Sequence, residues 1–262
     1  MYGIRPTDPG REIDWNRTSE DYGTWRPGFP ASFERWLKER RLGIGGQRVV
    51  DLGTGTGVLA RAFARLGGRV TGLDRAPGQI EQARALARAE GVEVDFRVAE
   101  AEETGLEAAS AQVVSAAQCW LYFDERRAIA EVVRLLEPGG RLLICHLCWL
   151  PREDAIARAS EELVLAHNPA WTAADWSGEV PEFPEWARED FELVEHLVYD
   201  EPLPFTRESW RGRIRACRGV GAALELEAVQ AFDEEHAALL ERIAPAEFGV
   251  LHRIDGLVLR PR

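Results

Sequence analysis

The segment from Val49 to Gly57 carries the residue types best suited to chemistry in this sequence. It reads Val-Val-Asp-Leu-Gly-Thr-Gly-Thr-Gly, so three alternating glycines follow a short apolar run that contains one acid, Asp51. Glycines let the backbone turn tightly and approach a ligand without a Cβ in the way. The apolar spacing after Gly57 predicts a helix, whose first turn presents free N–H groups at its positive end. The pattern therefore predicts a ligand-binding turn between a strand and a helix.

A second acid, Asp74, ends the next apolar run along the chain. A carboxylate at that place can accept two hydrogen bonds from the vicinal hydroxyls of a ribose. Residues 55–60 also match the glycine fingerprint of dinucleotide-binding turns. Asp51 argues against a dinucleotide, because its charge would repel a pyrophosphate and attract a cationic sulfonium. The pattern favours S-adenosylmethionine over a nicotinamide cofactor; the alternative without any ligand is a purely structural turn.

These acids and glycines need a sheet to hold them, and the hydrophobic pattern predicts one. Short apolar or alternating runs predict strands over 48–52, 69–74, 92–98, 111–117 and 141–148. Apolar residues spaced three and four apart predict helices over 58–66, 77–89 and 125–136. Strands and helices that alternate at this pace predict right-handed crossovers and an α/β fold with a doubly wound parallel sheet.

The alternation breaks after residue 150. Beyond it we expect a helix over 152–166, a strand over 191–199, two helices within 206–243 and a last strand over 249–259. The helical pieces are expected to form a cap over the carboxyl edge of the sheet, from residues 12–45, 151–175 and 206–243.

Length and composition fit a single α/β domain over residues 1–262. Hydrophobic residues make up 45% of the chain and charged residues 29%, which is enough apolar material for a core. We expect an N-terminal helical segment and a cofactor-binding core, followed by a cap insertion and C-terminal strands with a helical insertion. Their ranges are 1–45, 46–150, 151–189 and 190–262, with the insertion at 206–243.

The formal net charge of −12 argues against nucleic acid as a partner, because the average field repels a phosphate backbone. The N-terminus has no signal-peptide pattern, and no apolar stretch is long enough to cross a bilayer, so we expect a soluble cytoplasmic protein. The four cysteines are expected to be reduced thiols rather than disulfides or metal ligands: Cys119, Cys145, Cys148 and Cys217. We therefore expect no metal and no membrane; the pattern leaves the oligomeric state open.

The stretch 48–150 resembles the class I S-adenosylmethionine-dependent methyltransferases, in the branch that acts on small molecules. Residues 50–57 resemble the first motif of that family, and 70–74 resemble its second strand. Residues 99–102 resemble the loop after the third strand, and 136–142 resemble the turn before the fifth. The resemblance implies a Rossmann-like sheet of seven strands, of which the last is antiparallel.

The resemblance also implies roles for particular residues. Asp74 would bind the ribose, and Glu100, where many relatives have Asp, would meet the adenine amino group. Arg26 would pair with the cofactor carboxylate, and Gln118 follows the fourth strand, where the family closes over the methionine portion. The expected cofactor-binding residues are Arg26, Asp51, Gly53, Thr54, Gly55, Gly57, Asp74, Arg75, Glu100, Ala101 and Gln118.

Indole side chains are the candidates for the acceptor side. Loops at the carboxyl ends of parallel strands converge on one crevice. We expect this crevice beside Gly53 to Gly57, with Trp120 and at least one of Trp25, Trp149 and Trp171 on its wall. The alternative is a purely structural role, in which these rings only pack the cap onto the sheet.

Two histidines are candidate general bases: His146 in the fifth strand and His167 at the end of the following helix. A histidine in an apolar strand is more often a core residue, and an activated methyl donor needs a base only if the acceptor must lose a proton. The predicted reaction is methyl transfer from S-adenosylmethionine to a small-molecule acceptor. The alternatives are a nicotinamide-dependent oxidoreductase and a non-catalytic S-adenosylmethionine-binding protein.

Overall fold

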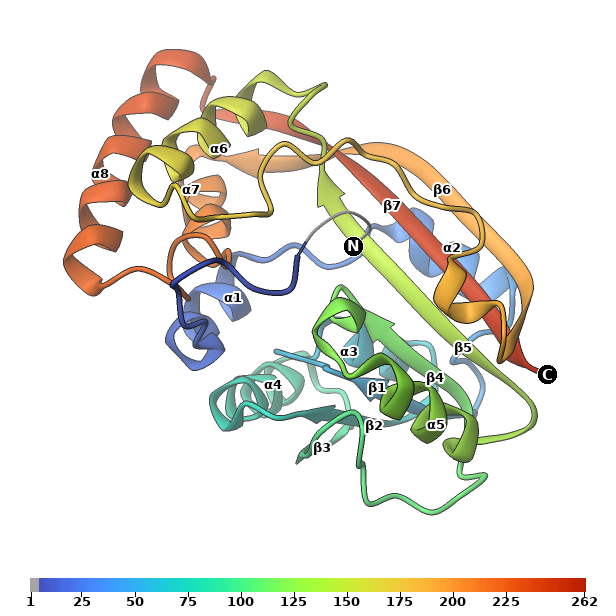
Figure 1. The fold of residues 1–262 in the computed structure, drawn as a ribbon. Helices are drawn as coiled ribbons and strands as arrows, with labels where there is room; N and C mark the ends of the chain where they lie inside the picture. Colours follow the sequence, from blue (N-terminus) through green and yellow to red (C-terminus); the bar gives the residue numbers. More distant parts are fainter. Residues whose placement is uncertain (1–4) are drawn as a thin grey trace.

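A seven-stranded sheet forms the centre of the computed structural model, which describes residues 5–262 (Figure 1). The strands are β1 (Arg48–Leu52), β2 (Arg69–Asp74), β3 (Asp95–Val98), β4 (Ala111–Ala117), β5 (Leu136–Trp149), β6 (Phe191–Thr206) and β7 (Glu247–Pro261). Their order is β3-β2-β1-β4-β5-β7-β6. Strands β1 to β5 pair in parallel, and β7 lies antiparallel between β5 and β6. The prediction of a doubly wound sheet with an antiparallel last strand is confirmed.

Two apolar clusters cover the two faces of the sheet. The larger cluster joins one face to α2 (Ala31–Glu39), α3 (Val58–Arg65) and α4 (Pro77–Glu90), and the smaller joins the other face to α5 (Glu125–Leu135). Neighbouring residues of β1 divide between them, Val49 in the first cluster and Val50 in the second. Side chains alternate across a strand, so a strand buried on both faces reads as the continuous apolar run seen in the sequence.

The remaining helices gather at the carboxyl end of β5 (Figure 1). They are α1 (Ser19–Trp25), α6 (Ala155–His167), α7 (Arg207–Arg215) and α8 (Leu226–Ile243). Helix α7 contacts both α1 and α8, and α8 also contacts α6. An ion pair of 2.7 Å between Arg215 and Asp21 ties α7 to α1. These four helices are called the cap below.

Helix α2 does not belong to the cap, which corrects the expectation for residues 12–45. Phe33 and Trp36 pack against β7 so closely that a Cβ at Gly256 would lie 2.8 Å from the Trp36 ring. The Trp36 indole also donates a 3.0 Å hydrogen bond to Glu195 of β6. The buried residues of α2 are Phe33, Trp36 and Leu37, which form an apolar stripe, and the helix lies beside β6 and β7 (Figure 1).

Three strand boundaries differ most from the sequence prediction. Strand β3 begins at Asp95 rather than at residue 92, and β5 begins at Leu136 because this residue pairs with Ala111 ahead of a bulge. Strand β6 continues past residue 199 to Thr206, paired with β7 along its length. Pro202 and Pro204 hide this continuation in the sequence, although an edge strand tolerates proline. Among the described residues, no helix is both long enough and apolar enough to cross a membrane.

Candidate functional site

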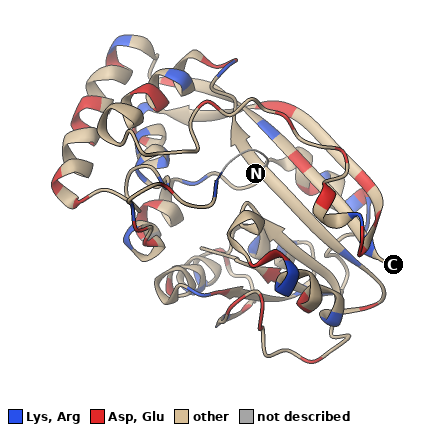
Figure 2. Ribbon diagram, in the orientation of Figure 1, with Lys and Arg blue, Asp and Glu red and all other residues tan. Residues whose placement is uncertain are grey.

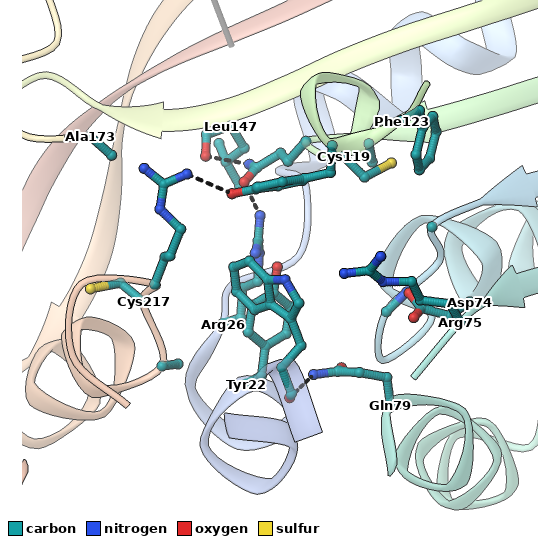
Figure 3. Close-up of a pocket in the computed structure, with 18 of the residues that line it drawn as sticks. Tyr22, Arg26, Asp74, Arg75, Gln79, Cys119, Phe123, Leu147, Ala173 and Cys217 are labelled. Carbon is teal, nitrogen blue, oxygen red and sulfur yellow. Dashed lines mark hydrogen bonds between the residues drawn. The ribbon is translucent and has the colours of Figure 1, made fainter. Parts of the chain in front are cut away.

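A cavity of about 300 Å³ lies at the carboxyl ends of the parallel strands, between the sheet and the cap (Figure 3). Ligands bind at this edge in open α/β sheets. Figure 3 shows Asp74 and Arg75 on one side of the cavity and Ala173 and Cys217 on the other, with Tyr22 and Arg26 between them. The cavity therefore spans from the glycine turn to the cap.

The three glycines of the turn after β1 have different environments. All three adopt left-handed φ angles, 58° at Gly53, 56° at Gly55 and 79° at Gly57. A Cβ at Gly53 would lie 2.8 Å from the Cys119 sulfur, and one at Gly57 would lie 2.6 Å from the Phe96 ring. A Cβ at Gly55 meets nothing closer than 3.8 Å. Gly55 therefore presents open backbone to the cavity, whereas Gly57 is required by packing and does not line the cavity.

Asp51 and Thr54 lie beneath the glycine turn rather than on the cavity wall. The Asp51 carboxylate is 1% exposed and accepts 2.6 Å hydrogen bonds from the hydroxyls of Thr54 and Ser115. Burial raises the pKa of Asp51 to about 6, and the two hydroxyl donors oppose that rise. The Asp51 carboxylate therefore stabilises the turn through Thr54 and Ser115. It does not reach the cavity wall, where it was expected to bind the cofactor.

Asp74, at the end of β2, does reach the cavity. Its two carboxylate oxygens accept 2.9 Å hydrogen bonds from the backbone N–H groups of Gly55 and Ala76. These bonds fix the carboxylate and leave each oxygen with acceptor capacity toward the cavity. Burial raises the pKa of Asp74, and the two N–H donors oppose that rise. Three further predicted residues line this end of the cavity: Arg75, Glu100 and Ala101.

Arg26 and Gln118 come together on the cavity wall although they lie far apart in the sequence. The Arg26 guanidinium donates a hydrogen bond to the Gln118 side-chain oxygen and lies 4.4 Å from the centre of the Tyr22 ring. The Gln118 amide in turn donates a 2.5 Å hydrogen bond to the carbonyl of Leu147. Burial, with the neighbouring Arg213 second, lowers the pKa of Arg26 to about 9. Gln118 has a φ of 63°, a strained conformation for a residue with a side chain, which is typical of functional sites.

The cap side of the cavity is aromatic and contains two buried ionisable groups. Its indoles are Trp149, Trp171 and Trp176. The Trp149 indole donates a 2.6 Å hydrogen bond to Glu161 of α6, and burial raises the pKa of Glu161 to about 7. The Arg213 guanidinium of α7 lies 4.7 Å from the centre of the Trp149 ring. Trp149 and Trp171 were expected on this wall and are found there.

Trp120 and Trp25 do not line the cavity, which corrects the predicted acceptor wall. Trp120 is 7% exposed and stacks on Trp186, with 4.7 Å between ring centres, in the apolar cluster under α5. Trp25 packs against α7, where a Cβ at Gly212 would overlap its ring. Both rings fill space between elements, because large aromatic side chains contribute most to packing when they are enclosed on all sides.

The two candidate bases also lie away from the cavity wall. His146 is buried within β5, and its Nδ1 lies 2.8 Å from a carboxylate oxygen of Asp255 in β7. Burial lowers its pKa despite that carboxylate. His167, the last residue of α6, faces α8, with Nε2 3.3 Å from a carboxylate oxygen of Glu235. The structure therefore places neither histidine at the ligand-binding cavity.

Sequence reasoning missed several residues of the wall. Glu161 and Arg213 come from cap helices, whose charged residues look like ordinary solvent-facing positions in the sequence. Further residues that line the cavity are Trp15, Tyr22, Gln79, Cys119, Tyr122, Phe123, Arg127, Cys148, Cys217 and Arg218. Among residues 5–262, no group of three or more His, Cys, Asp or Glu side chains is placed to hold a metal ion.

Comparison with known proteins agrees with this geometry. Residues 50–144 match the family model described as a methyltransferase domain. The chain is 32% identical to a ubiquinone biosynthesis O-methyltransferase of Xanthomonas oryzae pv. oryzae over 181 residues, which is 67% of this chain and 72% of that protein. It is 36% identical to a methyltransferase of Mycobacterium tuberculosis over 140 residues, 53% of each chain.

Solved structures give the same result. A methyltransferase from Anaeromyxobacter dehalogenans matches with a TM-score of 0.59 and 25% identity, over 89% of this chain and 96% of that one. A methyltransferase from Thiobacillus denitrificans, solved with S-adenosyl-L-homocysteine, matches with a TM-score of 0.56 and 25% identity, over 95% of this chain and 98% of that one.

Proposed function

Because the chain belongs to the class I S-adenosylmethionine-dependent methyltransferases, we propose that its cavity holds the cofactor along the ends of β1, β2 and β4 and the acceptor beneath the cap. The reaction is transfer of a methyl group from S-adenosylmethionine to a small-molecule acceptor. The atom that accepts the methyl group and the residues that carry out each part of the work are the subject of the proposal.

The residues of the first half of the cavity fit the cofactor. Gly55 offers bare backbone where a Cβ would enter the cavity. The Asp74 carboxylate is held by two N–H donors with acceptor capacity left for the ribose hydroxyls. Glu100 would accept from the adenine amino group, and the Arg26 guanidinium with Gln118 would hold the amino-acid end. When bound, the cofactor supplies a methyl group on a sulfonium sulfur, which is already activated for displacement.

We propose an oxygen atom of a planar, partly apolar molecule as the methyl acceptor. The observation that carries this proposal is the continuous cavity, which runs from the glycine turn to a wall of three indoles: Trp149, Trp171 and Trp176. Flat apolar walls favour a planar acceptor and exclude water from the displacement. A relative at 32% identity carries the name of an O-methyltransferase, which supports oxygen as the acceptor atom.

The charges of the cavity favour binding of the acceptor as an anion, whose proton has passed to solvent, so that no histidine base is needed. The guanidinium groups of Arg26 and Arg213 both line the cavity, and burial lowers the pKa of each, with the charge of Arg213 adding to the effect on Arg26. Positive charge within a few ångströms stabilises a phenolate or carboxylate relative to its neutral form. The residues of this chain therefore act by binding the acceptor as an anion, aligning it and excluding water.

A labelled-methyl assay tests the proposal. The protein is incubated with methyl-labelled S-adenosylmethionine and four matched aromatic acceptors: a phenol, a carboxylic acid, an amine and a thiol of similar size. We expect label in the methyl ether or ester and none in the amine or thiol products. Exclusive transfer to nitrogen or sulfur would refute oxygen as the acceptor atom.

We propose further that the protein works in the cytoplasm and does not act on nucleic acid. In Figure 2 acidic and basic segments are interspersed along the cap and the long strands, and the chain carries a net charge of −12. A phosphate backbone gains little from such a surface. A gel-shift experiment with duplex DNA and with RNA at low salt tests whether the protein binds nucleic acid. Binding below micromolar concentration would contradict this part of the proposal.

A further inference from the structure

Arg213 is a buried cation that has no ion-pair partner among the residues that the structure describes. The residue is 6% exposed, and its side chain lines the cavity from the inner face of α7. Its Nε is buried without a hydrogen-bond partner, and within residues 5–262 neither a hydrogen bond nor an ion pair engages its guanidinium. Its guanidinium lies over the face of the Trp149 ring, 4.7 Å from the ring centre. A buried guanidinium is unfavourable unless it is paired.

The nearby acids and cations do not supply that pair. One carboxylate oxygen of Glu161 accepts a hydrogen bond from the indole N–H of Trp149. Its second oxygen accepts a 2.7 Å hydrogen bond from the backbone N–H of Asp175. Arg26 adds a second positive charge on the same cavity. Arg218 has its own partner, because its guanidinium lies 3.1 Å from the Asp8 carboxylate. Among residues 5–262, Arg213 is therefore a buried wall cation that no carboxylate pairs, whereas Arg26 has at least the Gln118 amide as a hydrogen-bond partner.

The position of Arg213 separates it from the expected contacts to the adenosine end of the cofactor, although it neighbours Arg26. It projects from the cap against Trp149, the last residue of β5, whereas Gly55 and Asp74 lie at the ends of β1 and β2. A planar guanidinium that already stacks on an indole presents its in-plane N–H groups to a neighbouring anion. Two parallel N–H groups match a carboxylate in a bidentate arrangement.

We propose that Arg213 binds a carboxylate carried by the methyl acceptor, so that the acceptor is a planar aromatic acid rather than a neutral molecule. This inference rests on the proposed function, since it needs the acceptor beneath the cap. It adds a specificity residue: the carboxylate supplies the counter-charge that the protein lacks, and the ring fills the space among the three indoles. A neutral acceptor of the same shape leaves the buried guanidinium unpaired and binds more weakly.

A matched pair of probes tests the proposal: 3-hydroxybenzoate and its neutral amide, 3-hydroxybenzamide. Each is titrated by calorimetry into the protein saturated with S-adenosylhomocysteine. We expect the acid to bind at least about tenfold more tightly than the amide, the range of a charge-assisted bidentate pair. Equal affinities, or no binding of either probe, overturn the proposal.

Three variants assign the effect to Arg213. In Arg213→Met the preference for the acid should disappear, and in Arg213→Lys it should fall but persist, because lysine keeps the charge and loses the fork. Arg211→Met is the matched control, since Arg211 lies on the same helix and pairs with Asp233; this variant should retain the preference. An Arg213→Met protein that still prefers the acid overturns the proposal.

The affinity for S-adenosylhomocysteine separates the possible failures. Arg213→Met should bind it within about twofold of the wild type; a loss of tenfold or more would assign Arg213 to the cofactor carboxylate and overturn the acceptor role. Wild-type protein that does not bind S-adenosylhomocysteine at all would instead refute the proposed function. The melting temperature of ligand-free Arg213→Met should equal or exceed that of the wild type, because the substitution removes the desolvation cost of an unpaired buried cation.

Discussion

Replacement of Asp74 by asparagine is the sharpest test of the cofactor side of the cavity. The substitution keeps the size of the side chain and removes its charge. In the wild type, both oxygens accept 2.9 Å hydrogen bonds from backbone N–H groups, at Gly55 and Ala76. Asparagine keeps one acceptor oxygen and replaces the other by an NH₂ group, which cannot accept a hydrogen bond. At that position one backbone hydrogen bond is lost, and the contact to one ribose hydroxyl is lost or reversed in direction.

The expected magnitude follows from those contacts. Hydrogen bonds to a charged group contribute about 1.5–3 kcal/mol each, so loss of one charged contact to the ribose should weaken S-adenosylhomocysteine binding by roughly 10- to 150-fold. The loss of stability should be smaller. Burial raises the pKa of Asp74, so the wild-type charge is itself unfavourable in the ligand-free fold and its removal compensates for the weakened turn.

Calorimetry with S-adenosylhomocysteine and a thermal melt without ligand measure the two effects separately. Asp51→Asn is the control, because Asp51 lies beneath the same turn and bonds to Thr54 and Ser115. We expect Asp51→Asn to have the lower melting temperature of the two variants and Asp74→Asn to have the lower affinity for S-adenosylhomocysteine. Unchanged affinity in Asp74→Asn would refute the assignment of Asp74 to the ribose.

The remaining predictions concern the turn, the indoles and pH. Gly55→Val should abolish S-adenosylhomocysteine binding in calorimetry with a smaller loss of thermal stability, because its side chain enters open cavity; retained binding would make the turn purely structural. Trp120→Leu should lower the melting temperature and leave the acceptor KM unchanged, whereas Trp149→Leu should raise that KM; the opposite pattern would restore Trp120 to the acceptor wall. Because burial raises the pKa of Glu161 from 4.5 to about 7, the native carboxyl keeps a proton that the unfolded chain has lost. The free energy of unfolding should therefore fall between pH 4.5 and 7 by up to about 3 kcal/mol from this residue, and Glu161→Gln should remove that slope in urea titrations.

The sequence predicted the cofactor half of the cavity because its signals are local. The glycine turn joins a strand directly to a helix, and Asp74 ends the next strand, so chain order alone brings Gly55 and Asp74 to the same edge of the sheet. Arg26 and Gln118 needed the resemblance to a known family, because their contact joins segments far apart in the chain. Their roles toward the cofactor stay predictions until the variants are measured.

The acceptor half was harder to predict because aromatic residues have the same appearance in cores and in binding sites. Trp120 and Trp149 both lie at the carboxyl ends of buried strands, yet Trp120 packs under α5 while Trp149 faces the cap. The difference depends on where η3 (Glu185–Ala187) brings Trp186 against Trp120, which no periodicity reveals. His146 was similarly ambiguous, and the side chain that decides its environment, Asp255, lies on the antiparallel strand β7.

Helix α7 shows how one run of arginines serves both the fold and the site. Arg211 and Arg215 are one turn apart and share a face, where both pair with Asp233 of α8. Arg213, two positions from each, necessarily points to the other side, into the cavity. The acids that fasten the cap therefore cannot reach it, and a residue that looks like part of a solvated charge run becomes a buried cation. The neutralising charge has to arrive with a ligand, which is why the acid–amide comparison tests this part of the structure most directly.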